Sequence, residues 1–378
     1  MEILRKNIKN IIENIWERHF LNRGPLKLRE RTKVLLIFPS GLGNTVLAVG
    51  AVKSLIQGFP KAVLSAVYFQ KPTREMLDIL GYFRDVRFYD VQGKFRDKVL
   101  FFFFLLKNRF GIAISFFNGA DYKFNVLLYS ACIPLRLGFD LRSPLKFKVS
   151  PLFLSHTVRY DDKISEFENN LSLVDKLGIP LVRSVNFYVP KSVITGSERI
   201  TVRIGMHVGR NNPARPGLSL SSFVEIMEGL LKYPFSVYVF GGREETGYSG
   251  TIKNNFGDRV TDFIGKLDFK ETIGRIAGMD LFVSNDTGLM HIAASQGIPL
   301  IAIFGPTDTI KSAPVAKSPG QVRIITRNLS CSPCYPDQPA KACAGRNDCV
   351  SKISSESVIN EILNMVNRAE SLNNQPKQ

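Results

Sequence analysis

Two separate series of short apolar runs, each run followed by a helical pattern, constrain the fold of this chain more than any other feature. The first series starts with the apolar run 34–38 and the helical pattern 45–57, and it continues to about residue 138. The second starts near residue 200 and ends with a helical pattern over 355–370. Repeated βα units predict parallel sheets with helices on both faces. The chain is therefore expected to be α/β, with two doubly wound domains and a ligand at the carboxyl ends of the strands, in a cleft between them.

The chain divides into four predicted parts. Residues 184–198 contain Pro190, Gly196 and several polar residues, and they are the predicted linker. Residues 1–30 carry apolar side chains at three- and four-residue spacing, which predicts a helix that either packs on the domain or lies in a membrane interface. The predicted parts are a helical extension (1–30), an N-terminal Rossmann-like domain (31–190), a C-terminal Rossmann-like domain (191–353), and a C-terminal helix and tail (354–378).

Charge is high and unevenly distributed. The 378 residues include 50 Lys and Arg against 33 Asp and Glu, a net charge of +17. Residues 1–189 carry +13 of this, and residues 190–378 carry +4. A basic half indicates an anionic partner, which composition alone leaves as nucleic acid, anionic lipid or a phosphorylated substrate. Because no helix-turn-helix, zinc finger or RNP-type motif is present, we expect no nucleic-acid partner.

Nothing in the sequence resembles a secretory leader or a membrane-spanning helix. The longest apolar run, Val99 to Leu106, is far shorter than a span needs. We expect this run to be a helix buried on the sheet or one that inserts shallowly into a membrane. Five cysteines do not suggest a secreted disulfide scaffold, so a cytoplasmic chain is expected. Cys132, within an apolar helical pattern, is expected in the core.

Three loops that follow predicted strands carry glycines. Glycine lets a backbone approach a ligand closely, and a helix that starts after the loop offers free N–H groups. The loop at Gly43 is neither a dinucleotide fingerprint nor a Walker loop, and a purely structural turn explains it equally well. Arginine in the second loop suits a diphosphate, and the carboxylate of the third suits a ribose, although solvated loops are equally compatible. These loops contribute Gly43; Gly209, Arg210 and Arg215; and Gly241, Gly242 and Glu245.

The most specific pattern is the segment 280–294. An apolar strand brings Asp286, Thr287 and Gly288 to its carboxyl end, and a helix then places His291 one turn later. Residues 305–308 (GPTD) end the next strand at the same edge of the sheet. A lone histidine on a helix is usually structural, but its position next to a strand end favours ligand binding here.

At these residues the sequence resembles a known family. The segments 285–294 (NDTGLMHIAA) and 304–308 (FGPTD) resemble the signature of glycosyltransferase family nine, the ADP-heptose:lipopolysaccharide heptosyltransferases. Residues 34–55 and 241–245 also match its pattern, and the resemblance spans about residues 33–365. It implies a GT-B fold, in which two doubly wound Rossmann-like domains face a cleft. The N-terminal domain would receive the acceptor and the C-terminal domain the sugar nucleotide.

The resemblance implies a reaction and its partners. The reaction is an inverting, metal-independent transfer of heptose, or a related sugar, from ADP-heptose or a similar sugar nucleotide. The acceptor is the lipopolysaccharide core or another anionic, lipid-linked saccharide. No cofactor is required, and the protein is expected in the cytoplasm, peripheral on the inner membrane surface. A phosphorylated lipid-linked acceptor would also explain why the basic charge lies in the first half.

The resemblance also implies roles for individual residues of this chain. Glu245 would hold the ribose, with Glu244 as the alternative register. The donor's diphosphate and sugar would be held by Asp286, Thr287, Gly288 and His291, of which Asp286 and His291 are also the expected catalytic residues. Gly209, Arg210 and Arg215 would approach the phosphates.

One position departs from the family pattern. The first βα turn usually reads Gly-Asp, with the aspartate as general base, but here it reads Gly43-Asn44. An amide cannot accept the acceptor's proton at physiological pH. One reading is that water or the acceptor's own phosphate takes the proton. A second reading is a catalytically degenerate protein that binds sugar nucleotide or lipopolysaccharide. A third reading is another base, for which the candidates are Asp121, Asp140, His156, Asp161 and Asp162.

Four cysteines follow the last predicted strand. Cys331, Cys334, Cys343 and Cys349 have a spacing that fits a structural zinc site. The alternative, which cytosolic cysteines favour, is a set of reduced or redox-labile structural thiols. We therefore expect no metal requirement, with zinc as the alternative.

Overall fold

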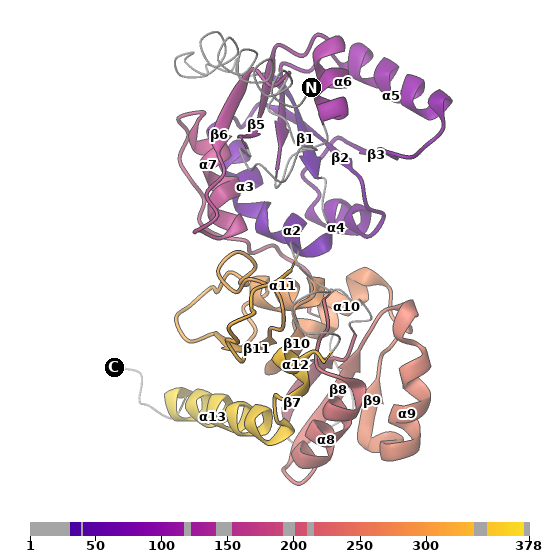
Figure 1. The fold of residues 1–378 in the computed structure, drawn as a ribbon, viewed down its shortest axis with the longest axis vertical. Helices are drawn as coiled ribbons and strands as arrows, with labels where there is room; N and C mark the ends of the chain where they lie inside the picture. The colour runs from indigo at the N-terminus through magenta and orange to yellow at the C-terminus, as the bar shows by residue number, and fades with distance from the viewer. Residues whose placement is uncertain are drawn as a thin grey trace, which may run out of the picture. The chain divides into compact units, whose positions relative to one another are not determined.

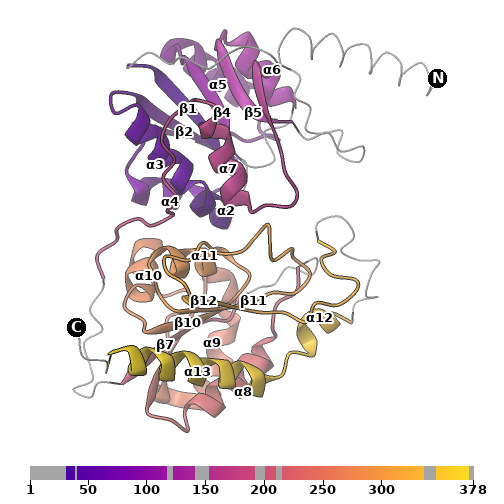
Figure 2. The same ribbon diagram turned by 90° about the vertical axis from the view of Figure 1, so that its left-hand side faces the viewer.

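The computed structural model describes residues 31–38, 41–116, 122–140, 153–191, 201–209, 215–335 and 346–373. The chain divides into two compact units, unit 1 (Met1–Ser184) and unit 2 (Val185–Gln378) (Figures 1 and 2). Within the described ranges, each unit has one six-stranded sheet in which all paired strands are parallel. The predicted α/β class with two doubly wound domains is confirmed.

Unit 1 has the strand order β3-β2-β1-β4-β5-β6. Its strands are β1 (Lys33–Phe38), β2 (Val63–Tyr68), β3 (Asp85–Phe88), β4 (Ile112–Ser115), β5 (Leu135–Asp140) and β6 (His156–Arg159). Its helices are α2 (Leu42–Leu47), α3 (Val49–Gly58), α4 (Pro72–Leu80), α5 (Phe95–Asn108), α6 (Tyr122–Ser130) and α7 (Glu166–Asp175).

Different helices cover the two faces of this sheet. On one face, Phe101 and Leu105 of α5 pack with Phe124 and Leu128 of α6 against the sheet. On the other face, α3 lies against α7 so closely that a Cβ on Gly50 would be 2.7 Å from the Phe167 ring. Both faces are therefore apolar, as the continuous apolar strands predict.

Unit 2 repeats the same order, β12-β11-β10-β7-β8-β9. Its strands are β7 (Val202–His207), β8 (Phe235–Phe240), β9 (Val260–Asp262), β10 (Leu281–Asn285), β11 (Leu300–Ile303) and β12 (Val322–Ile325). Its α-helices are α8 (Leu220–Leu230), α9 (Gly247–Phe256), α10 (Phe269–Ile276), α11 (Gly288–Ser295), α12 (Asp348–Ser351) and α13 (Ser355–Asn373). Two 3₁₀ turns, η1 (Arg243–Glu245) and η2 (Gly257–Arg259), flank α9.

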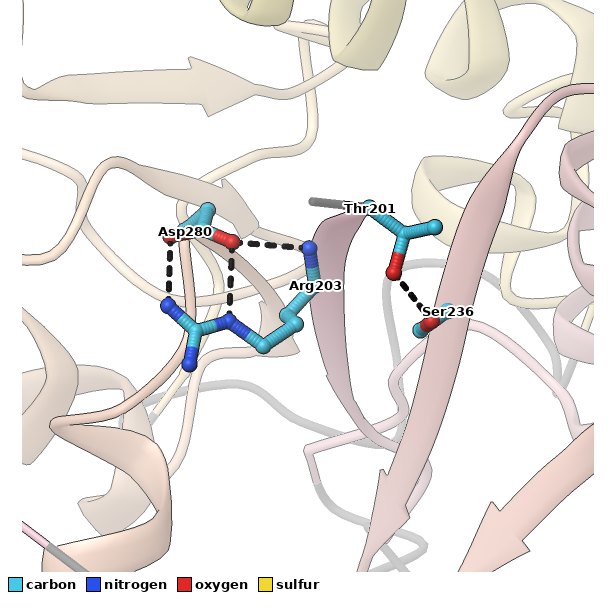
Figure 3. Close-up of polar contacts among 4 residues, drawn as sticks. All are labelled: Thr201, Arg203, Ser236 and Asp280. Carbon is cyan, nitrogen blue, oxygen red and sulfur yellow. Dashed lines mark hydrogen bonds and ion pairs between the residues drawn. The ribbon is translucent and has the colours of Figure 1, made fainter. Parts of the chain in front are cut away.

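The last helix packs within unit 2. A Cβ on Gly229 of α8 would be 2.4 Å from Ile359 of α13, and Ser355 Oγ donates to Glu225 Oε2 at 2.6 Å. At the amino edge of the sheet, Arg203 of β7 binds the Asp280 carboxylate just before β10 through three nitrogens at 2.9–3.0 Å (Figure 3). This pair fixes the entry of two neighbouring strands far from their carboxyl ends.

The two sheets share one important topological point. In each, the first strand of the unit lies beside the fourth, so β1 pairs with β4 and β7 pairs with β10. The order of connection reverses there, and helices leave toward opposite faces. Ligands of doubly wound folds bind outside the carboxyl ends of the strands at this switch point.

Several elements differ from the sequence prediction. The run 98–107 lies in a helix as expected, but it is not simply buried, since Phe103 is 60% exposed. The prediction that Cys132 belongs to the core is wrong, because it lies after α6 with φ 54° and is exposed. The predicted N-terminal helix over 1–30 lies outside the described residues.

Candidate functional site

A hydrogen-bonded chain crosses the switch point of unit 2. His207, the last residue of β7, is buried, and its Nδ1 lies 3.0 Å from Thr287 Oγ1. Thr287 Oγ1 in turn lies 3.2 Å from Ser284 Oγ of β10. The ends of β7 and β10 are therefore joined by polar side chains just before α11 begins at Gly288.

A buried carboxylate lies at the end of the neighbouring strand β8. Glu245 in η1 is 6% exposed, and its Oε2 accepts from the Gly242 N–H at 2.7 Å. A Cβ on Gly209 would be 2.6 Å from Glu245 Oε1 and 2.9 Å from His207 Nε2. Only glycine therefore fits at residue 209 without displacing these side chains. Burial raises the pKa of Glu245, although the Gly242 N–H opposes that shift.

An ion pair between a half-buried arginine and a buried carboxylate lies on the other side of the switch point. Asp286 follows β10, is 2% exposed, and accepts from Arg215 Nη2 at 2.8 Å. The Arg215 guanidinium also lies over the Tyr335 ring, 4.9 Å from its centroid. Arg215 is thus held between a carboxylate and an aromatic face, which fixes the direction of its remaining donors.

His291 occupies the first turn of α11 and is buried. Burial lowers its pKa to about 4; the Asp286 charge opposes this shift and the Arg215 charge adds to it. The ring is therefore neutral near pH 7. Its Nδ1 has no hydrogen-bond partner among the described residues. A buried ring nitrogen without a protein partner is suited to a hydrogen bond with a ligand.

The end of β11 adjoins Asp286, whose N–H donates to the Ile303 carbonyl at 3.0 Å. Thr307 beyond this strand is buried, and its Oγ1 has no partner within the described ranges. The Pro306 carbonyl accepts from the N–H groups of Cys334 and Tyr335, both at 3.0 Å. The segment that contains Cys334 is thereby held on this edge, and it carries Tyr335 to Arg215.

The loop before α8 is fixed by the last residue of β10. Asn285 Oδ1 accepts from the Leu218 N–H at 2.8 Å, and Asn285 Nδ2 donates to the Leu218 carbonyl at 3.2 Å. A Cβ on Gly217 would be 2.5 Å from the Asn285 amide. Asn285 therefore positions the backbone next to Arg215.

These side chains form one row along the carboxyl edge of four neighbouring strands, β8, β7, β10 and β11. Strands about 4.8 Å apart give this row a length of roughly 14 Å. The row contains, in order, the Glu245 carboxylate, the N-terminus of α11, the neutral His291 ring and the Arg215 guanidinium. That sequence of groups suits a long ligand with hydroxyls at one end and a negative charge in the middle.

The corresponding point of unit 1 is apolar. Phe38, the last residue of β1, packs against Phe116, which follows β4, with ring centroids 5.3 Å apart. The Phe83 ring contacts the Phe38 ring edge-to-face, with the ring centroids 5.9 Å apart. Asn44 lies half-buried in α2, the short helix after β1. Unit 1 therefore lacks, among its described residues, the polar row that unit 2 has.

The structure separates the candidate bases. Asp140 ends β5 and is buried, and the exposed Asp161 and Asp162 follow β6, so all three lie at the carboxyl edge of the sheet. His156 starts β6, pairs in register with Leu137, and has its Nδ1 3.0 Å from Ser155 Oγ. It lies three residues, roughly 10 Å, before that edge. Asp121 lies outside the described residues.

Two other predicted residues also lie outside the described ranges, Arg210 and Cys343. Cys331, Cys334 and Cys349 are half-buried, and a Cβ on Gly305 would be 3.5 Å from Cys349 Sγ. Among the described residues, no group of three or more His, Cys, Asp or Glu is placed to hold a metal. Because the fourth cysteine is not described, the zinc hypothesis stays a prediction.

Three residues of the site were not singled out from the sequence. His207 ends a predicted strand just before Gly209, and this position is the signal that could have identified it. Asn285 belongs to the motif 285–294, and its signal is that a polar residue in a buried strand needs a partner. Tyr335 carries no local signal, because its contact with Arg215 joins residues far apart in the chain.

Part of this site, including Glu245, Asp286 and His291, lies within a region that matches a known family, whereas His207, Gly209 and Arg215 precede that region. The model of glycosyltransferase family 9 (heptosyltransferase) matches residues 220–343. Lipooligosaccharide heptosyltransferase 2 of Haemophilus influenzae is 30% identical over 111 residues, 28% of this chain and 32% of that protein. Lipopolysaccharide heptosyltransferase 3 of Escherichia coli is 23% identical over 71% of this chain and 82% of its own length. The match spans about a third of the length of the first curated relatives.

Solved structures match most of the chain. A glycosyltransferase family 9 protein from Veillonella parvula has a TM-score of 0.73 at 16% identity, covering 91% of this chain and 100% of that one. E. coli ADP-heptose lps heptosyltransferase II has a TM-score of 0.68 at 18% identity, with 89% and 99% covered. TibC from enterotoxigenic E. coli, an iron-containing dodecameric glycosyltransferase, has a TM-score of 0.53 at 12% identity, with 91% and 78% covered. These likenesses show the fold, which is GT-B with two Rossmann-like domains.

Proposed function

We propose that this chain, whose residues 220–343 match the model of glycosyltransferase family 9 (heptosyltransferase), transfers a heptose or related sugar from a sugar nucleotide such as ADP-heptose to a lipid-linked saccharide of the lipopolysaccharide core. The observation that carries this proposal is the polar row on β8, β7, β10 and β11, with its helix N-terminus and its buried His291. The curated relatives that the chain matches are heptosyltransferases, which supports the same reaction class.

We propose that each part of the donor contacts a different group of the row. Glu245, fixed by the Gly242 N–H, accepts hydrogen bonds from the ribose hydroxyls. The N-terminus of α11 and Thr287 face the diphosphate, where free N–H groups and the helix dipole favour negative charge. Arg215 neutralises Asp286 and keeps further donors for the phosphates. Glycine at 209 and 241 lets the backbone approach the nucleotide.

The negative charge that develops on the leaving diphosphate explains how the polar row would speed the transfer. In an inverting displacement, the acceptor hydroxyl attacks the anomeric carbon while the bond to the diphosphate breaks. Negative charge then grows on the diphosphate. Fixed donors, here the α11 N-terminus, Arg215 and the neutral His291, stabilise that charge without rearrangement. We therefore propose metal-independent transfer with inversion, in which protein groups take the part that a cation would otherwise have.

The acceptor hydroxyl also needs a group that takes its proton, and Asn44 cannot do so. We assign this part to a carboxylate at the carboxyl edge of the sheet in unit 1, one of Asp140, Asp161 and Asp162. The basic first half of the chain, net +13, supplies the attraction for an anionic acceptor. A lipid-linked acceptor places the enzyme at the cytoplasmic face of the inner membrane, as a peripheral protein.

Transfer by the wild-type chain beside Asn44→Asp tests this proposal. Both proteins are incubated with ADP-heptose and a lipopolysaccharide-core acceptor, and the product is detected by mass spectrometry. We expect product from wild type, because its base is not at position 44. A wild type without activity beside an active Asn44→Asp would instead show a degenerate enzyme. Asp161→Asn, Asp162→Asn and Asp140→Asn then identify the base by loss of kcat at unchanged donor affinity.

A further inference from the structure

Helix α5 of unit 1 exposes apolar side chains that an ordinary surface helix would bury. Phe95, Leu100, Phe103 and Leu106 are 82%, 56%, 60% and 38% exposed, whereas Phe101 and Leu105 on the opposite side are buried in the core. Figure 1 shows α5 beside α6, on the side of unit 1 opposite α3 and α7. A helix that is apolar on both sides belongs in a protein core or in contact with a lipid phase.

The exposed apolar residues form one continuous stripe. Phe95, the half-buried Val99, Phe103 and Leu106 follow one another at spacings of four, four and three residues, which places them on one face of the helix. Leu100 widens the stripe. Large contiguous apolar surface is rare on a chain that meets only water, so this stripe is a contact surface.

Basic residues flank the stripe at both ends of the helix. The five are Lys94, Arg96, Lys98, Lys107 and Arg109. In the described part of the chain, none of the five forms an ion pair. The only acidic residue between positions 94 and 109 is Asp97. Residues 94–109 therefore carry a net charge of +4.

The combination of an apolar stripe with flanking basic residues favours one kind of binding partner over another. A second copy of the chain would bring the same positive charge to the interface, and the repulsion opposes pairing. A bilayer with anionic headgroups satisfies both halves of the surface, since the aromatic and aliphatic side chains enter the acyl boundary while Lys and Arg lie at the headgroups. No helix among the described residues is long and apolar enough to cross a membrane.

We propose that the stripe Phe95–Val99–Leu100–Phe103–Leu106 of α5 is a docking surface for anionic phospholipid membranes. The role of this surface rests on the proposed function, because docking would hold unit 1 at the bilayer that contains the acceptor. Vesicle binding needs neither donor nor acceptor, so the two proposals can fail separately. Vesicle binding can fail while transfer to a delipidated acceptor succeeds, and vesicle binding can succeed while transfer fails.

Vesicle sedimentation with the full-length chain tests the surface. Binding is compared between phosphatidylcholine vesicles and vesicles in which about a third of the lipid is phosphatidylglycerol. We expect binding to the anionic vesicles, weakened by salt. Phe95→Ser/Phe103→Ser should reduce the partition coefficient at least ~10-fold, and Arg96→Gln/Lys107→Gln should reduce it by a similar factor. The matched control is Tyr188→Ser/Ile310→Ser, which removes two exposed apolar side chains of unit 2 (85% and 59% exposed) and should bind as wild type does.

A fluorescence probe distinguishes α5 from the rest of the chain. Trp16 is the single tryptophan, so Trp16→Phe/Phe103→Trp reports on the stripe alone. We expect a blue shift on anionic vesicles and quenching by brominated lipids. An unshifted spectrum with bound vesicles would overturn the proposal, as would wild-type binding by Phe95→Ser/Phe103→Ser. A dimer in light scattering that Phe95→Ser/Phe103→Ser dissociates, without vesicle binding by wild type, would show that a second copy occupies the stripe instead.

Discussion

At the end of β7 in unit 2, buried His207 reaches Thr287 across the switch point at 3.0 Å. At the end of β1 in unit 1, Phe38 packs on Phe116 across the equivalent point. The two sheets have the same strand order, so topology alone would make both points binding sites. Side-chain chemistry separates them. In unit 2 the point is polar and preorganised for a charged ligand, and in unit 1 two phenyl rings close it.

The difference extends to the surfaces around each point. Unit 2 places the buried Asp286 and the half-buried Arg215 together in the site. Unit 1 carries basic residues and exposed apolar side chains together on α5. We infer that unit 2 recognises a compact ligand of fixed shape and unit 1 a large amphipathic one. A sugar nucleotide and a lipid-linked saccharide fit these descriptions.

The largest effect is expected from the ion pair of Arg215 with the buried Asp286. Asp286→Asn leaves Arg215 without its counter-charge beside the proposed diphosphate site, and we expect kcat/KM for transfer to fall ~100-fold, the scale found when a fixed group next to developing charge is lost. The matched control is Asp280→Asn in the exposed pair with Arg203 (Figure 3), which lies at the opposite edge of the same sheet. It should leave transfer unchanged and cost at most about 1 kcal/mol of stability, as exposed ion pairs do. Equal losses in both variants would contradict a special role for Asp286.

A pH dependence of stability is expected from His291. Its pKa in the folded state, about 4, lies below that of an unfolded chain, so only the unfolded state gains a proton as the pH falls from ~6.5 toward ~4. The free energy of unfolding should therefore decrease over that range, by about 3 kcal/mol in total from this group. Urea unfolding of wild type and His291→Gln measures it. An identical decrease in both proteins would show that His291 does not contribute.

Glu245→Gln should separate stability from binding. The raised pKa of Glu245 means that its charged form is less favourable in the folded than in the unfolded chain, so removing the charge should raise Tm near neutral pH. Donor affinity should fall ~10-fold, because a neutral amide accepts weaker hydrogen bonds from ribose hydroxyls. Glu244→Gln, at the exposed neighbour, should change neither quantity. Thermal unfolding and calorimetric titration with ADP measure the two effects.

The smallest effect is expected from the aromatic contact with Arg215. Tyr335→Ala removes a cation–π contact worth roughly 0.5–1 kcal/mol, and we expect donor affinity to fall about two- to fivefold. Tyr335→Phe keeps the ring and should bind ADP as wild type does. Equal loss in both variants would assign the effect to the hydroxyl and not to the stacked ring.

Much of this arrangement follows from local sequence. The alternation of apolar runs and helical patterns predicts the parallel sheets, and the segment 285–294 predicts the site around His291. β6 and α7 were not predicted, although Ser165 accepts from the Glu168 N–H at the start of α7 in the expected capping pattern. Contacts between distant residues, such as Tyr335 with Arg215, leave no such pattern. The sequence also does not predict which side of α5 is exposed, because residues 99–106 are apolar on both faces of the helix.

The central claim is that the donor lies along the carboxyl edge of the sheet in unit 2. A crystal structure of the full-length chain soaked with ADP-heptose tests it most directly. We predict density for the diphosphate at Thr287 and the N-terminus of α11, with the ribose within hydrogen-bond distance of Glu245. Well-defined nucleotide density elsewhere, with this edge empty, would contradict the account.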